Sequence, residues 1–146
     1  MSSRATIDHL LACLDSAGKR STPQRYAVCR ALVEHGGHPT VANVFERVRA
    51  EFPMISQATV YNTVDTLRDL GLLRPLDILA HEHTHYDLDP TSHINLVCTS
   101  CGAISDIHTA DLEILLIQVG QRSGYQIDRE AGLLAYGSCP RCTAES

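Results

Sequence analysis

Two cysteine pairs in the second half of the chain have the spacing of metal ligands. They are Cys98-x-x-Cys101 and Cys139-x-x-Cys142, with 37 residues between the pairs. Thiolates two residues apart in a tight turn can bind one ion, and two such turns supply the four-sulfur tetrahedral set that zinc prefers. The separation exceeds that of a zinc ribbon, so the ion would close a whole subdomain. We expect structural zinc; a redox-active pair or unliganded thiols are the alternatives.

The composition favours metal binding over disulfides. A chain of 146 residues with 44% hydrophobic residues suits one ordinary domain or two small ones. No run approaches the roughly 18 apolar residues of a membrane helix, and the start, MSSRATIDHL, has no charged-then-apolar signal region. We therefore expect a cytoplasmic protein without a membrane partner. In that reducing compartment, six cysteines indicate metal binding.

The charge is unevenly distributed along the chain. Residues 1–80 contain nine Lys/Arg and eight Asp/Glu, whereas residues 81–146 contain three and nine. The pattern suggests a near-neutral module that carries the arginines and an acidic module suited to cations. A solvated acidic surface explains the second half equally well.

The first half predicts a winged helix-turn-helix domain. Amphipathic patterns with capping residues at their starts and Gly or Pro at their ends predict helices within residues 4–18, 21–37, 39–53 and 56–71. Residues 72–79 and 83–89 then resemble two short strands of a hairpin. Four such helices followed by a hairpin make up a winged helix-turn-helix domain.

The second half predicts a smaller module with strands and one helix. Residues 89–92 form a polar joint, residues 94–107 predict two strands that turn at the cysteines, and residues 109–124 predict a helix. Its Leu112, Leu115, Leu116 and Val119 should face inward. Residues 125–139 predict a second hairpin. A module of about 50 residues needs a metal or a partner for stability. The fold class is thus α+β, with a domain at 1–88, a hinge at 89–92 and a domain at 93–146.

Six stretches together resemble the ferric uptake regulator (Fur) family of bacterial metal-dependent repressors. They are TPQR, GGHPT, ISQATVYNTVDTL, GLL, LVCTSCG and YGSCPRC, in matching order and spacing over nearly the whole chain. The resemblance implies a homodimeric transcription regulator rather than an enzyme. Its N-terminal winged helix-turn-helix domain would bind DNA, and its small C-terminal α/β domain would dimerise and hold the zinc. A second metal at the hinge would control DNA binding.

The resemblance also implies a ligand set for the regulatory metal: His38, Asp87, His93, Asn95 and Asp106. Nitrogen and oxygen ligands without sulfur suit Fe(II), Mn(II) or zinc. Asp106 and Asn62 are typical of the family's peroxide-sensing branch, in which ferrous iron reacts with peroxide, a ligand histidine is oxidised and repression is lost. His38 and His93 would be the oxidised residues. The alternative is a regulator of iron, manganese or zinc uptake without redox sensing.

Asn95 departs from the family pattern, which has histidine at this position. An asparagine offers only a neutral carbonyl oxygen, a weak ligand for a transition metal. Either the site has fewer ligands, or a histidine from the wing replaces it. His81, His83 and His85 alternate, so on a strand they would share one face. They could equally be solvated residues of the wing.

The helix within residues 56–70 has a polar side that would contact DNA. Gln57, Tyr61 and Asn62 lie opposite its apolar stripe, and the first half of a recognition helix meets base edges. By resemblance, Tyr61 contacts a thymine methyl or a phosphate and Asn62 a base or the backbone. Arg20 would enter the minor groove of an A·T-rich palindromic operator. Ordinary packing of Tyr61 and a solvated Arg20 are the alternatives.

Two other classes of function also fit parts of the pattern. A zinc hydrolase needs three protein ligands and a water, and Asp87, His93 and Asp106 could provide the ligands. A zinc-stabilised adaptor that binds only proteins would leave the polar side of Tyr61 and Asn62 without a role.

Overall fold

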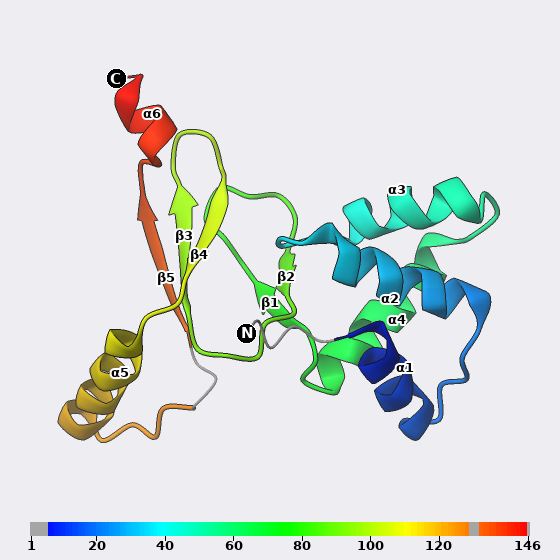
Figure 1. Cartoon of the computed structure of the whole chain (residues 1–146), viewed down its shortest axis with the longest axis horizontal. Helices are drawn as coiled ribbons and strands as arrows, with labels where there is room; N and C mark the ends of the chain where they lie inside the picture. Colours follow the sequence, from blue (N-terminus) through cyan, green and yellow to red (C-terminus); the bar gives the residue numbers. More distant parts are fainter. Residues whose placement is uncertain (1–5, 129–131, 146) are drawn as a thin grey trace. The chain divides into compact units, whose positions relative to one another are not determined.

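The computed structural model describes residues 6–128 and 132–145. The chain divides into two units, Met1–Pro90 and Thr91–Ser146, so the division falls within residues 89–92 (Figure 1). Both units combine helices with a small sheet, and the predicted α+β class is confirmed. None of the described helices combines the length and the apolar character that a membrane span requires.

The first unit contains four helices followed by a hairpin. Its elements are α1 (Ile7–Ser16), α2 (Pro23–His35), α3 (Val41–Glu51), α4 (Gln57–Asp69), β1 (Arg74–Leu76) and β2 (His85–Asp87). The hydroxyls of Thr22, Thr40 and Ser56 accept hydrogen bonds from backbone N–H groups in the first turns of α2, α3 and α4. These bonds satisfy amides that a helix leaves unpaired, so the four predicted helices are confirmed.

The apolar sides of these helices form one core. Leu10, Val28, Val60, Val64 and Leu67 are all 0% exposed. Three of them lie on α4, at the spacing that places side chains on one face of a helix. Packing of this face fixes the rotation of α4, so the opposite, polar face points to the surface.

The wing strands are shorter than predicted. β1 and β2 pair antiparallel, with Leu76 opposite His85. On its other side, β2 receives one further bond, because the Tyr86 N–H donates to the Pro39 carbonyl at 2.9 Å. His81 and His83 lie outside both strands. The expectation that the three wing histidines share a strand face is therefore wrong.

The second unit has a three-stranded sheet and two helices. Its elements are β3 (Ile94–Cys98), β4 (Ile104–Ile107), α5 (Ala110–Ser123), β5 (Leu133–Gly137) and α6 (Pro140–Ala144). The strand order is β4-β3-β5, with β4 antiparallel and β5 parallel to β3. The hairpin at the cysteines is confirmed, but among the described residues β5 stands in place of the predicted second hairpin. Its parallel pairing sets Gly137 beside Cys98.

Much of the apolar surface of the second unit is uncovered. Leu112 is 2% exposed, but Leu115 and Val119, which were expected to face inward, are 44% and 43% exposed. In Figure 1, α5 lies beyond one end of the sheet rather than over its face. All five residues of β5 are also exposed. The expectation for Leu115 and Val119 is wrong for the single chain because no element of the described chain covers this side of α5.

Candidate metal centres and nucleic-acid interface

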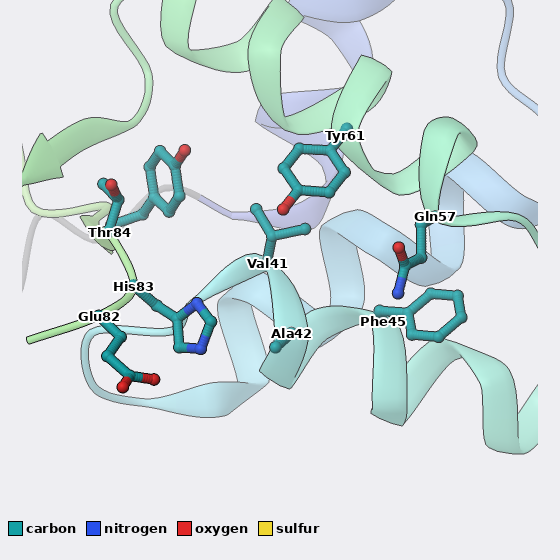
Figure 2. Close-up of a pocket in the computed structure, with 9 residues that line it drawn as sticks. Val41, Ala42, Phe45, Gln57, Tyr61, Glu82, His83 and Thr84 are labelled. Carbon is teal, nitrogen blue, oxygen red and sulfur yellow. The ribbon is translucent and has the colours of Figure 1, made fainter.

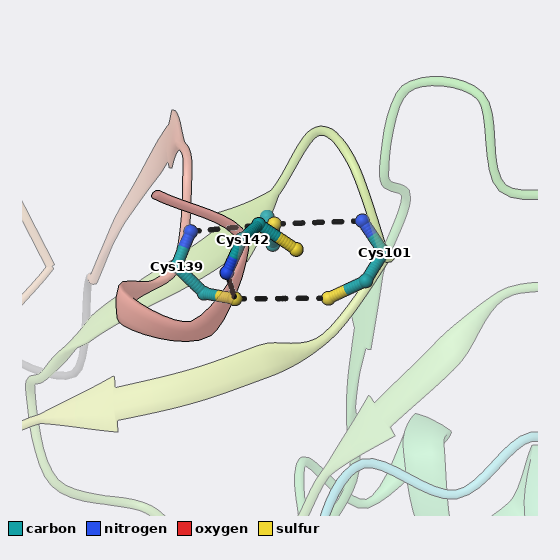
Figure 3. Close-up of side chains that lie close together, drawn as sticks. Cys101, Cys139 and Cys142 are labelled. Carbon is teal, nitrogen blue, oxygen red and sulfur yellow. Dashed lines mark hydrogen bonds between the residues drawn. The ribbon is translucent and has the colours of Figure 1, made fainter. Parts of the chain in front are cut away.

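Cys98, Cys101, Cys139 and Cys142 converge in the second unit. Their sulfur atoms all lie within 4.8 Å of one another, and Cys101 Sγ and Cys139 Sγ are 3.8 Å apart (Figure 3). Cys98 ends β3 and Cys101 lies in the turn that follows, whereas Cys139 caps the N-terminus of α6 and Cys142 lies in its first turn. The parallel pairing of β5 with β3 brings the two pairs together, although they are far apart in sequence.

Backbone amides support negative charge on these sulfurs. The N–H groups of Cys101 and Cys139 donate to Cys98 Sγ at 3.5 and 3.3 Å, and these two bonds lower the pKa of the Cys98 thiol to about 5. The pKa of Cys142 is instead raised to about 12, mainly by its hydrogen bond with Cys139. Thiolates this close repel one another, so all four are deprotonated together only when a cation compensates them. Four soft ligands in a closed set fit zinc.

In the first unit, a buried histidine faces a buried carboxylate. His38 Nε2 and Asp87 Oδ2 are 3.8 Å apart, and their side chains are 6% and 7% exposed. His38 lies in the segment between α2 and α3, and Asp87 ends β2. The bond from Tyr86 to Pro39 holds these two segments together. The first unit thus presents one nitrogen and one carboxylate ligand side by side.

The second unit contains a similar pair. His93 Nε2 and Asp106 Oδ1 are 3.9 Å apart, and the His93 side chain is 3% exposed. His93 Nδ1 lies 2.8 Å from the Thr91 carbonyl oxygen. A carbonyl only accepts, so Nδ1 carries a proton, and in the neutral form of the ring the nitrogen with the lone pair is Nε2, which faces Asp106. A second hydrogen bond that orients the ring in this way is typical of metal-ligating histidines.

Asn95 lies beside this pair, opposite Asp106 in the sheet register. The residue is 5% exposed, and its Oδ1 is a buried atom without a hydrogen-bond partner among the described residues. A buried polar oxygen without a partner costs free energy. A cation beside Asp106 would satisfy it, so the donor set of this half fits a metal with oxygen and nitrogen preference.

His108 is a further residue of this half that sequence reasoning missed. Its ring stacks on that of His93, with centroids 5.0 Å apart and an interplanar angle of 28°. His108 follows β4 and is two residues beyond Asp106, so strand alternation puts both on one side. The alternation was readable in the sequence; the position of His93 across the sheet was not.

The polar side of α4 borders two hollows on the first unit. Gln57 and Tyr61 line a cavity of about 360 Å³, which also has Val41 and Phe45 of α3 and His83 of the wing loop in its wall (Figure 2). Tyr61 is 49% exposed, so its hydroxyl is available to a ligand.

Asn62 borders a different hollow, together with Lys19 and Arg25. Arg20 is exposed between α1 and α2, and its carbonyl accepts a hydrogen bond from Arg25 Nη1 at 2.6 Å. Three positive residues, Lys19, Arg20 and Arg25, therefore lie close together in the chain, and two of them, Lys19 and Arg25, line this hollow beside α4. Lys19 and Arg25 were not among the candidates drawn from the sequence, although three of the seven residues in the run KRSTPQR are basic.

Known proteins are similar over nearly the whole chain. The model of the ferric uptake regulator family matches residues 16–131. The peroxide-responsive repressor PerR of Staphylococcus epidermidis is 32% identical over 147 residues, which cover 96% of this chain and 95% of the relative.

Two solved structures are similar in fold. The Campylobacter jejuni peroxide stress regulator has a TM-score of 0.70 and 28% identity, with 94% of this chain and 99% of that chain covered. The Helicobacter pylori ferric uptake regulator Fur, whose structure reveals three functional metal binding sites, has a TM-score of 0.81, with 98% and 97% of the chains covered. Its identity of 18% makes it evidence for the fold alone. With a family model that matches most of its length, this chain belongs to the ferric uptake regulator family.

Proposed function

We propose that this protein is a metal-dependent, DNA-binding transcriptional repressor that acts as a cytoplasmic homodimer and is inactivated by peroxide. The observation that carries the proposal is that each unit sets a buried histidine beside a carboxylate: His38 faces the buried Asp87, and His93 faces Asp106, whose side chain is 27% exposed. Polar groups buried as these histidines and Asp87 are cost free energy, and a bound ion would compensate that cost. The same residues are the ones that family resemblance assigns to a regulatory metal.

In the proposed mechanism, one Fe(II) or Mn(II) ion binds both pairs. His38 and Asp87 would be its ligands from the first unit, and His93, Asp106 and the Asn95 amide oxygen its ligands from the second. An ion that binds two units at once favours the arrangement in which both sets of ligands reach it. Metal binding would thereby select one orientation of the two DNA-binding units of a dimer, and the Cys98–Cys142 cluster would hold structural Zn(II).

Peroxide sensing is supported by the ligand types and by similar proteins that are named as a peroxide-responsive repressor and a peroxide stress regulator. A bound ferrous ion would supply the redox chemistry with peroxide, and an adjacent histidine would gain oxygen. His38 and His93 are the residues at risk, because their ring nitrogens face the carboxylates. Loss of a ligand would release the ion and relieve repression.

The experiment uses the full-length protein, loaded without air with one equivalent of Fe(II) and treated with one equivalent of hydrogen peroxide. Peptide mass spectrometry should find one added oxygen on His38 or His93, together with loss of DNA binding. Protein loaded with Mn(II) is the matched control and should remain unmodified. Unmodified histidines and intact DNA binding in the iron form would refute peroxide sensing.

A metal-uptake regulator without redox sensing is the second candidate; in this case Asn95 would leave a weakened site that senses metal without redox chemistry. One imidazole fewer weakens binding of late metals most, because they depend on nitrogen donors. The replacement Asn95→His should therefore raise the affinity for zinc more than that for manganese, measured by competition with a chromophoric chelator. Equal changes for the two metals would show that Asn95 is not a ligand.

The proposed DNA interface consists of Arg20, Gln57, Tyr61 and Asn62. Operators can be selected from random duplexes with the Mn(II)-loaded protein; we expect A·T-rich palindromes. Tyr61→Ala and Arg20→Ala should each weaken binding, by about 1–3 kcal/mol where a base contact is lost. Arg20→Ala should also reduce the salt dependence, since one cationic contact is removed. Arg47 pairs with Glu34 on the surface, and Arg47→Ala is the control for the loss of one positive charge. Unchanged binding by both variants would exclude this surface.

A further inference from the structure

Two histidines of the wing direct ring nitrogens at each other. His81 Nδ1 and His85 Nε2 are 3.1 Å apart, and the rings are arranged edge to face, with centroids 5.2 Å apart and an interplanar angle of 65°. Both side chains are half-buried. Neither belongs to the four-cysteine cluster or to the two histidine–carboxylate pairs.

A second hydrogen bond fixes the orientation of His85. Its Nδ1 lies 2.8 Å from the His38 carbonyl oxygen, so Nδ1 carries the proton. In the neutral ring, Nε2 is then a lone pair directed at His81. A ligand nitrogen on one side of the ring and an N–H donating to a backbone carbonyl on the other is the arrangement found around metal-bound histidines.

The distance between the two nitrogens also fits a shared ion. With metal–nitrogen bonds of about 2.0–2.1 Å, two ligands of a tetrahedral ion are about 3.3 Å apart, and ligands at a right angle about 2.9 Å. The observed 3.1 Å lies between these values. An ion could thus replace the proton shared by the two rings with little movement of either residue.

We propose that His81 and His85 form a separate binding site on the wing for a late transition-metal ion, Zn(II), Ni(II) or Cu(II). Imidazole ligands suit these ions, whose affinity for nitrogen exceeds that of manganese or ferrous iron. Solvent completes the coordination. The site differs in its metal preference from the oxygen-rich regulatory site.

The ion would connect three parts of the first unit. His81 lies in the loop that joins β1 and β2, and its backbone N–H donates to the Ile78 carbonyl at 3.1 Å. His85 begins β2 and bonds to the segment of His38. A metal bound by both histidines therefore holds the wing loop against β2 and against the segment before α3.

His83 supplies a matched control within the same loop. It lines the cavity beside Tyr61 and Val41, with Glu82 and Thr84 (Figure 2), whereas His81 contacts His85. His83 differs from His81 in position rather than in chemistry. If metal binding required only several histidines in one loop, replacement of either His81 or His83 by alanine would lower the affinity for the metal.

The test uses full-length protein with its zinc retained and with His93→Ala and Asp106→Ala, which remove the second unit's regulatory ligands. Titration with Ni(II) against a chromophoric chelator should reveal one equivalent of bound Ni(II) per chain. His81→Ala and His85→Ala should each lower this affinity at least about 10-fold, because removal of a ligand should cost no less than removal of a residue that only orients a ligand. His83→Ala should leave it unchanged. Electron paramagnetic resonance of the Cu(II) form should show two coupled imidazole nitrogens, reduced to one in His81→Ala.

His81→Ala is the decisive variant, because its side chain lies in a loop outside the core and its removal should not prevent folding. Absence of the nickel equivalent, its retention in His81→Ala, or an equal loss in His83→Ala would each overturn the proposal. These outcomes leave the proposed regulatory function untouched, because His93 and Asp106 are replaced in every protein compared and the other proposed regulatory ligands are the same in all of them.

Discussion

The two units differ in how they bury apolar residues. In the first, five side chains from three helices are fully buried in one core. In the second, α5 leaves Ile114, Leu115, Ile117 and Val119 more than 40% exposed, and Leu112 is the helix's buried apolar residue. Small modules that cannot bury enough apolar surface depend on a metal or on another chain. The comparison indicates that the first unit is stable through its own core, whereas the second would need the proposed zinc and a second copy.

The largest expected effect follows from removal of a zinc ligand. Cys98→Ser should release one zinc per chain and abolish both dimerisation and the cooperative fold of the second unit, because structural zinc contributes folding free energy directly. The helices of the first unit should retain their circular dichroism. Metal analysis measures the loss of zinc, and light scattering measures the loss of the dimer.

Cys13 is the control for this change, because it lies on α1, outside the sulfur cluster. Cys13→Ser should retain zinc and the dimer. If Cys98→Ser formed normal dimers without zinc, the metal would be dispensable. The second unit would then not depend on zinc for its stability.

A core substitution in the first unit should have a smaller and local effect. Leu67 is 0% exposed, and Leu67→Ala should lower the free energy of unfolding of this unit by about 2–5 kcal/mol, since it leaves a cavity. Chemical denaturation measures the change, and zinc content should stay constant. Leu70 on the same helix end is 42% exposed, so Leu70→Ala should cost no more than about 0.5 kcal/mol. Loss of zinc in Leu67→Ala would argue that the two units do not fold separately.

The smallest of the three effects concerns the uncovered side of α5. Ile117 is 56% exposed, and Ile117→Glu would place a charge on this side of α5, where we propose that the second copy packs. The dimer should dissociate about 10- to 100-fold more readily, which corresponds to about 1.4–2.7 kcal/mol, while each chain keeps its zinc. Analytical ultracentrifugation measures the constant, and the neighbouring Gln118→Glu is the control for charge. An unchanged dimer would place the interface elsewhere.

The predicted helices agree with the structure because their signals are local. A capping hydroxyl such as that of Thr40 bonds to an amide three residues away, and an apolar stripe such as that on α4 repeats within one helix. The strands were less predictable. Residues 125–139 alternate as a hairpin would, but β5 pairs in parallel with β3, a partner 39 residues earlier by the register of Ile94 with Leu133. Such a choice depends on contacts between distant segments.

The candidate metal sites show the same difference between features that depend on local sequence and features that depend on distant segments. The sequence alone determined which four sulfur atoms are candidate ligands, because two thiols in a short turn can face one ion wherever the turn lies. It also supplied the candidate ligands Asp87 and His93. Tertiary structure decided that His81 faces His85 while His83 lines the cavity beside Tyr61, that His108 stacks on His93, and that the Asn95 oxygen is buried opposite Asp106. These contacts depend on the register of short strands and on the path of loops. The alternation of polar and apolar residues along the chain determines neither of them. The partner of a strand is instead selected by packing between segments that are distant in sequence.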